Sequence, residues 1–167
     1  RSTHDGTTQL RTAAGTDRVD ILAVRGETLV DTGLDADRIT VETEQTSVVN
    51  AASSIDAPLT VNGGTGADTL DVTSGTVFSR TGALTATAIT GLGTPAGILY
   101  GEIETMSLTL GGGDDTFVVE ATGADTTLDL GAGADSADVR SSSHALSILG
   151  KSGADRIVLG SLAPAAG

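Results

Sequence analysis

The stretch "GGGDDTFVVEATGADTTLDLGAGADSADV" (residues 111–139) states one pattern twice. Each half has glycines, then an aspartate, then apolar residues at alternate positions, and Asp115 and Asp135 lie twenty residues apart. Alternation of apolar residues is the period of a β-strand. The glycines that precede the aspartate can adopt the positive φ angles that a tight turn needs. The stretch therefore predicts a strand, a turn that ends at the aspartate, and a second strand.

The same pattern extends along most of the chain. Six aspartates fit the frame, each with apolar residues seven positions before it and two and four positions after it: Asp17, Asp37, Asp68, Asp115, Asp135 and Asp155. The intervals between them are 20, 31, 47, 20 and 20 residues. The interval of 47 divides if Ala96 takes the place of the aspartate, with Ile89 before it and Ile98 and Tyr100 after it. The repeat therefore predicts units of about twenty residues.

Such a unit cannot bury its apolar face alone, but units stacked on one another can. We therefore expect an all-β fold, a parallel β-solenoid of about seven coils that spans residues 1–167 as one segment. The two longer intervals predict insertions that bulge from the stack at residues 43–54 and 73–84. The sequence "ADRI" at residues 36–39 recurs at 154–157, an offset of 118 residues. This offset predicts a larger tandem unit of 118 residues, of which the chain covers about one and a half copies.

The composition limits the possible partners. Acidic residues outnumber basic ones by 22 to 9, for a net charge of −13, which argues against nucleic acids and anionic membrane surfaces. No apolar run is long enough for insertion into a membrane. The absence of cysteine excludes disulfides and thiolate metal sites. With two Phe and one Tyr, the core is expected to consist of Val, Ile, Leu and Ala.

Three glycine-rich segments carry a family resemblance: "NGGTGADTLDV" (residues 62–72), "GGGDDTFVV" (111–119) and "GAGADSADV" (131–139). They resemble the calcium-binding RTX, or hemolysin-type, repeats. The run from 89 to 119 is similar to segments of very large tandem-repeat bacterial surface proteins. The resemblance implies calcium ions as partners, bound between stacked turns, and an extracellular or cell-surface location. The ligands it implies are Asp68, Asp115 and Asp135, then Asp17, Asp37 and Asp155, with Asp35 and Asp114 as further carboxylates.

An alternative without metal stays open for the same turns. An aspartate in a tight turn can accept hydrogen bonds from nearby backbone N–H groups. The chain also departs from the RTX pattern, because the motif occurs at one turn of each unit instead of both. We therefore expect the aspartates to lie along one edge of the stack.

The repeat favours a structural role, as a fibre, stalk or adhesin spacer, over an enzyme. The end strands of a solenoid have unpaired edges, so we expect head-to-tail assembly with neighbouring copies. Two alternatives are a polysaccharide- or ice-binding module and a carbohydrate-active β-helix protein. For the latter, the predicted insertions offer chiefly Glu44 and Arg80 as ionisable groups. His4 and His144 have no second histidine near them in the sequence, and we expect each of them to be an exposed residue in a turn.

Overall fold

The computed structural model describes residues 6–44, 54–75 and 77–160, and these residues form two β-sheets and no helix. The first sheet has nine strands in this spatial order: β1 (Thr8–Arg11), β3 (Thr28–Asp31), β5 (Leu59–Asn62), β9 (Thr94–Gly101), β8 (Ala88–Gly91), β7 (Thr81–Leu84), β11 (Thr116–Val119), β13 (Ser136–Val139) and β15 (Arg156–Leu159). The second has six: β14 (Leu146–Leu149), β12 (Asp125–Gly131), β10 (Thr105–Gly111), β6 (Thr69–Ser74), β4 (Arg38–Glu44) and β2 (Arg18–Ile21).

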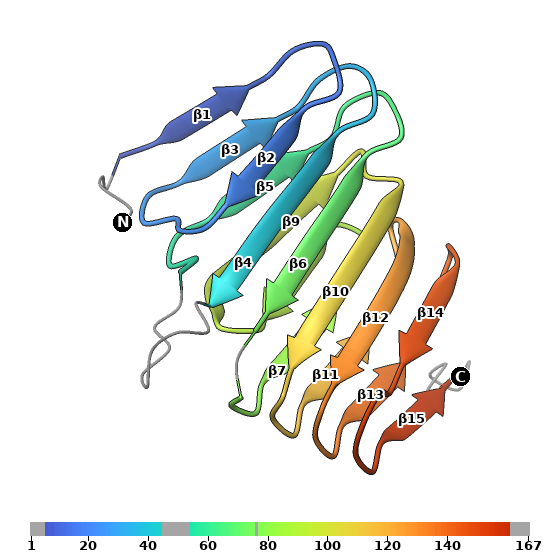
Figure 1. Cartoon of the computed structure of the whole chain (residues 1–167). Coiled ribbons are helices and arrows are strands. Elements are labelled where there is room, and N and C mark those ends of the chain that lie inside the picture. Colours follow the sequence, from blue (N-terminus) through green and yellow to red (C-terminus); the bar gives the residue numbers. More distant parts are fainter. Residues whose placement is uncertain (1–5, 45–53, 76, 161–167) are drawn as a thin grey trace, which may run out of the picture.

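The chain passes back and forth between the two sheets as it advances along the stack, with one strand in each except at β7, β8 and β9, which all lie in the nine-stranded sheet (Figure 1). Every pairing in the six-stranded sheet is parallel. In the nine-stranded sheet the pairs that β8 makes with β7 and β9 are antiparallel, and all the others are parallel. The predicted all-β fold with parallel sheets is therefore confirmed, and the arrangement is compatible with a β-solenoid.

Strand register follows the alternation in the sequence. Leu108 pairs with Leu128, and Leu128 pairs with Ile148, each twenty residues further along the chain. Val19 and Ile39 pair in the same way between β2 and β4. One side chain in two points inward, so β6 and β10 alternate buried and half-buried residues. The apolar ladders that the sequence predicted thus form the core.

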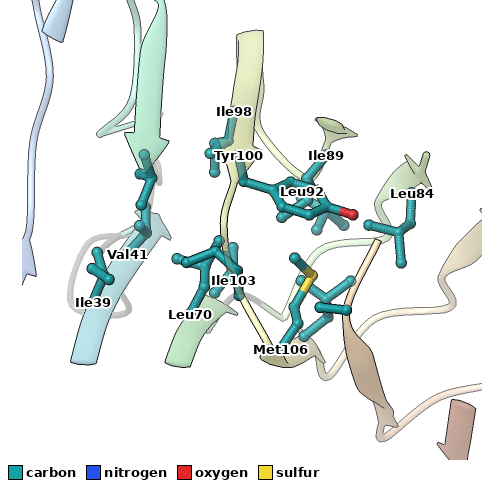
Figure 2. Packing of buried hydrophobic residues seen from close by; sticks show 14 of the residues in the cluster. Ile39, Val41, Leu70, Leu84, Ile89, Leu92, Ile98, Tyr100, Ile103 and Met106 are labelled. Carbon is teal, nitrogen blue, oxygen red and sulfur yellow. The ribbon is translucent and has the colours of Figure 1, made fainter. Parts of the chain in front are cut away.

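The largest core side chains lie beside β7, β8 and β9. Phe117, Tyr100 and Met106 are buried there, and Figure 2 shows Tyr100 and Met106 among Leu84, Ile89 and Leu92. The Tyr100 hydroxyl donates a hydrogen bond of 2.7 Å to the carbonyl of Thr85. The chain therefore places its bulkiest core side chains where the repeat is interrupted.

That interruption is a hairpin, and the frame predicted around Ala96 is wrong. Ile89 in β8 pairs antiparallel with Ile98 in β9, so both belong to one hairpin instead of two successive coils. Leu92 and Gly93 form the turn, with φ angles of 51° and 76°. Positive φ angles at both turn residues match a turn type that two-residue hairpins favour.

The predicted insertion at residues 73–84 is also wrong. Thr73 and Ser74 continue strand β6, and residues 81–84 form β7, which pairs with β8 and β11 inside the nine-stranded sheet. Of the predicted insertion at 43–54, Thr43 and Glu44 end β4, Ser54 is buried, and residues 45–53 lie outside the described residues.

Replacement of Leu128 by alanine tests the inward ladder. Leu128 is fully buried between Leu108 and Ile148, so we expect Leu128→Ala to lower the free energy of unfolding by about 2–5 kcal/mol. Leu34→Ala makes the same change at a side chain that is 54% exposed, and we expect a loss of less than about 0.5 kcal/mol. Urea unfolding measures both variants, and equal losses would contradict the assigned core.

Candidate functional site: two aspartate ladders

The aspartates predicted from the sequence lie in turns that stack on one another, and glycine makes this stacking possible. Gly64 has a φ of 93°, and a Cβ atom there would lie 2.1 Å from the carbonyl oxygen of Gly33. Gly131 has a φ of 89°, and a Cβ atom would lie 1.8 Å from the carbonyl oxygen of Gly111. Both the backbone angle and the close approach of the next turn therefore require glycine.

Three turns replace one of these glycines with another residue and keep its conformation. Ala13 has a φ of 79°, Asp35 of 75° and Lys151 of 66°. Residues other than glycine seldom adopt such angles. The stacked turn imposes the conformation even where the sequence departs from the motif.

The first ladder comprises Asp17, Asp37, Asp68 and Glu104, in the turns that lead from the nine-stranded to the six-stranded sheet. The backbone N–H of Asp17 donates to Oδ1 of Asp37 (2.7 Å), and that of Asp37 donates to Oδ1 of Asp68 (2.8 Å). The N–H of Asp68 donates to Oε2 of Glu104 (2.7 Å). Each carboxylate thus binds the backbone of the preceding turn.

The second ladder comprises Arg80, Asp115, Asp135 and Asp155, in the turns that lead from the six-stranded back to the nine-stranded sheet. The N–H of Arg80 donates to Oδ1 of Asp115 (2.7 Å). The N–H of Asp115 donates to Oδ1 of Asp135 (2.8 Å). The N–H of Asp135 in turn donates to Oδ1 of Asp155 (3.2 Å). The ladders lie along opposite edges of the stack, which Figure 1 shows as two rows of connecting turns. The prediction that all the aspartates share one edge is therefore wrong.

Asp35 and Asp114, the additional carboxylates predicted beside the motif, make the same kind of contact at more exposed positions. Oδ2 of Asp35 accepts the N–H of Gly15 (3.1 Å), and Oδ1 of Asp114 accepts the N–H of Ala134 (2.8 Å). Of the eight predicted ligands, seven therefore accept a backbone N–H from an adjacent turn, and Asp17 is the exception among the described contacts.

Glu104 and Arg80 belong to the ladders but were not predicted. Glu104 lies two residues before Met106, as Asp68 lies two residues before Leu70, and Met106 pairs with Leu70. An acidic residue two positions before alternating apolar residues was therefore the signal for Glu104. It was missed because the repeat was aligned on Ala96 instead. Arg80 contributes its backbone N–H to the ladder, and the identity of its side chain gives no signal for a backbone contact.

Four ladder aspartates are buried, namely Asp37, Asp68, Asp115 and Asp135, whereas Asp17 and Asp155 are half-buried and Glu104 is exposed. Asp37, Asp68 and Asp135 are at most 3% exposed, and the Oδ2 atom of each is buried without a hydrogen-bond partner in the described structure. Burial raises the pKa of Asp68, Asp115 and Asp135 above the ordinary value for aspartate, and the donated N–H partly offsets this shift. Neighbouring carboxylates raise these pKa values further.

Calcium would have to bind through the carboxylate oxygens that the ladders leave free. Calcium takes six to eight oxygen ligands, often several carboxylates. Across residues 6–44, 54–75 and 77–160, no group of three or more His, Asp or Glu side chains is placed to hold a metal ion. The Oδ1 atoms already accept N–H groups, so the buried Oδ2 atoms are the ones that remain to face an ion.

A pocket of about 350 Å³ lies beside the first ladder, lined by Glu102, Ile103, Glu104, Gly123, Asp125 and His144. His144 is exposed, as predicted, and its backbone N–H donates to Oγ1 of Thr122 (2.9 Å). Two of the carboxylates are engaged elsewhere. Glu104 accepts the N–H of Asp68, and Asp125 accepts the N–H of Ala145 (3.1 Å).

Glu44 and Arg80, the ionisable groups of the predicted insertions, meet as an ion pair. The Glu44 side chain is 2% exposed, and Nε of Arg80 donates to its Oε2 (3.2 Å). The guanidinium also lies over the ring of Phe78, 5.8 Å from its centroid. The pair joins the end of β4 to the connection before β7, next to the turn at Gly93, where a Cβ atom would lie 2.4 Å from Glu44.

Comparison with protein-family models, with curated proteins and with solved structures found no match. The described residues contain no helix that is long and apolar enough to cross a membrane.

Asp68→Asn tests the electrostatics of the first ladder. Asparagine keeps an oxygen for the N–H of Asp37 but carries no charge. Because the folded-state pKa of Asp68 is raised, its carboxyl group stabilises the fold below about pH 4, and that contribution is lost as the pH rises through the folded-state pKa. We therefore expect the variant to gain stability relative to wild type between pH 4 and pH 7.

Urea unfolding at several pH values measures this difference, and a constant difference would contradict the assignment. Asp68→Ala is the control. It removes the acceptor and leaves the N–H of Asp37 buried and unpaired, so at pH 4 we expect a loss of about 1–3 kcal/mol.

Proposed function

We propose that this chain is a structural segment of an extracellular tandem-repeat protein, in which it serves as part of a fibre, stalk or adhesin spacer. One observation carries the proposal. In both ladders every carboxylate except that of Asp17 accepts a backbone N–H of the preceding turn, so the polar groups of the repeat bind the chain's own backbone. A side chain engaged in this way supports length and stiffness instead of a reaction.

The proposed segment is a β-solenoid rod whose regular coils contain about twenty residues. The offset of 118 residues supports a larger tandem unit, since "ADRI" opens β4 in one half of the chain and β15 in the other. A rod of this kind lengthens by stacking, because each coil pairs with its neighbours and a further copy continues both sheets. The extracellular location rests on the resemblance to large bacterial surface proteins.

Calcium is the proposed ion of this rod on the strength of the same resemblance. In this proposal separate calcium ions bind beside the Oδ2 atoms, those of Asp17, Asp37 and Asp68 along one edge and that of Asp135 along the other. Because no three carboxylates of the described residues converge on one point, other oxygens must supply the remaining ligands of each ion. Bound calcium would neutralise stacked carboxylates that otherwise repel one another. The hydrogen-bonded ladder is the competing account, because it joins the turns without an ion.

A polysaccharide-binding or carbohydrate-active role is the second candidate, and the pocket between Glu102 and His144 is the observation that favours it. The pocket lies where the regular repeat is broken, and three carboxylates line it. The structural role is preferred because Glu104 and Asp125 are committed to backbone N–H groups of adjacent turns.

Thermal unfolding with millimolar calcium and then with excess chelator separates the ion from the hydrogen-bonded ladder. If calcium binds the folded turns, an ion concentration of 100 times the Kd adds about 2.7 kcal/mol of stability and raises the melting temperature. Asp68→Asn should then lose part of the rise, because it removes one candidate ligand. Equal melting temperatures in both conditions would remove calcium from the proposal and leave the rod.

The rod itself is tested by small-angle X-ray scattering of one copy and of two copies joined in tandem. Six strands at about 4.8 Å predict an increase in maximum dimension of about 29 Å for the second copy. The scattering profile should remain that of one stiff particle. A profile of two beads that move independently would contradict a structural rod.

A further inference from the structure

The two ends of the stack leave apolar core positions uncovered in the described part of the chain. Leu10 in β1 is 39% exposed, and Ile157 and Leu159 in β15 are 43% and 72% exposed. The equivalent positions one coil inward, Ala137 and Val139, are 0% and 7% exposed. Each end therefore presents an apolar surface together with the open edges of both sheets.

The ladders also end in complementary groups. Asp17, at the start of the first ladder, donates its N–H to Asp37, but no described N–H donates to its carboxylate, and its Oδ2 is buried. Asp155, at the end of the second ladder, accepts the N–H of Asp135, but its own N–H has no carboxylate partner among the described residues. One end of the stack thus lacks a donor, and the other lacks the matching acceptor.

These complementary groups lie on opposite edges of the stack. Asp17 follows a strand of the nine-stranded sheet, whereas Asp155 follows a strand of the six-stranded sheet. If the Asp17 turn of a second copy stacks on the Asp155 turn of the first, β1 of the second copy lies on β14, and β2 lies on β15. The second copy is then rotated by half a turn about the stack, and all new strand pairs are parallel.

The chain already contains this exchange of sheets. Shifted by 118 residues, β1, β2, β3 and β4 overlap β12, β13, β14 and β15. Each strand lies in the other sheet from the strand that it overlaps: β1 is in the nine-stranded sheet, for example, and β12 is in the six-stranded sheet. The same sequence pattern therefore folds in either sheet. A half-turn between copies therefore repeats a relation that exists within one copy.

We propose that a second copy of this chain docks on the β14–β15 end through its own β1–β2 end, rotated by half a turn, so that the N–H of Asp155 donates to the Asp17 carboxylate. This interface rests on the proposed structural role and specifies the contact by which copies join. The register of the ladder sets Ile157 against Val19 and Leu159 against Ile21, which continues the core. It also sets Ser147 beside Gln9 on the outer face.

Engineered disulfides test the rotation, because the chain has no cysteine of its own. Matched residues of paired strands are close enough for a disulfide. We expect the variant with Gln9→Cys and Ser147→Cys to form dimers and longer chains under mild oxidation. The variant with Gln9→Cys and Val158→Cys is the matched control, since it joins copies that dock without rotation, β15 on β1.

Electrophoresis without reductant distinguishes the outcomes, with single-cysteine variants as the background. Efficient joining through residue 147 alone supports the half-turn. Joining through residue 158 alone, or through neither pair, overturns it. The scattering of tandem copies tests the rod separately, so a stiff tandem without joining through residue 147 refutes this interface and leaves the structural role.

Asp17→Ala tests the hydrogen bond itself. Its carboxylate accepts no described N–H within one copy, so with excess chelator, where no calcium is bound, the variant should keep the wild-type melting temperature. In the background of Gln9→Cys and Ser147→Cys we expect joining to slow about tenfold, because a buried N–H loses a charged acceptor. An unchanged rate would show that Asp155 and Asp17 do not meet.

Discussion

The hydrogen bond from a backbone N–H to the carboxylate of the next turn is the contact on which this stack depends. Within the sheets, parallel pairing satisfies the backbone of each strand, but at the edges the chain reverses direction and its N–H groups leave the ladder of strands. Asp37, Asp68, Asp115, Asp135 and Asp155, with Glu104, provide acceptors at these reversals. The glycines beside them let each turn approach the next closely enough for the contact to form.

This solution has an electrostatic cost. Asp37, Asp68 and Asp135 each satisfy one N–H with Oδ1, while the Oδ2 atom is left without a partner in the described structure, and neighbouring carboxylates raise the pKa of Asp68 and Asp135. The raised pKa values of Asp68, Asp115 and Asp135 express that cost. A proton or a cation would each relieve it, so the stability of the stack is coupled to the composition of the surrounding solution.

The sequence predicts the regular parts of this structure well, because their signal is local. Alternation places Leu70, Leu108 and Leu128 in the core, and the glycines before each aspartate predict the turns. The hairpin of β8 and β9 could not be predicted by the same means. Ile89 and Ile98 have the spacing of the repeat, and only their antiparallel pairing shows that they belong to a hairpin.

The candidate site shows the same limit. All six motif aspartates were located, but the edge on which each one lies depends on how many strands precede it in each sheet. Glu104 continues the first ladder after the hairpin, and Asp115 follows β10, half a coil later, so the later aspartates lie at the opposite edge. Spacing between aspartates does not contain that information, because a hairpin and a coil of similar length give the same interval.

The same hairpin gives the stack unequal faces. Where β6 and β10 are neighbours in one sheet, β5 and β11 are separated by three strands in the other, and the two additional strands make that face about 10 Å longer. A stack with one long and one short face must curve, with the nine-stranded sheet on the convex side, and Phe117, Tyr100 and Met106 fill the core at the point of divergence. If copies joined with the proposed half-turn, successive arcs would bend in opposite directions, and the resulting filament would follow a shallow zigzag about a straight axis.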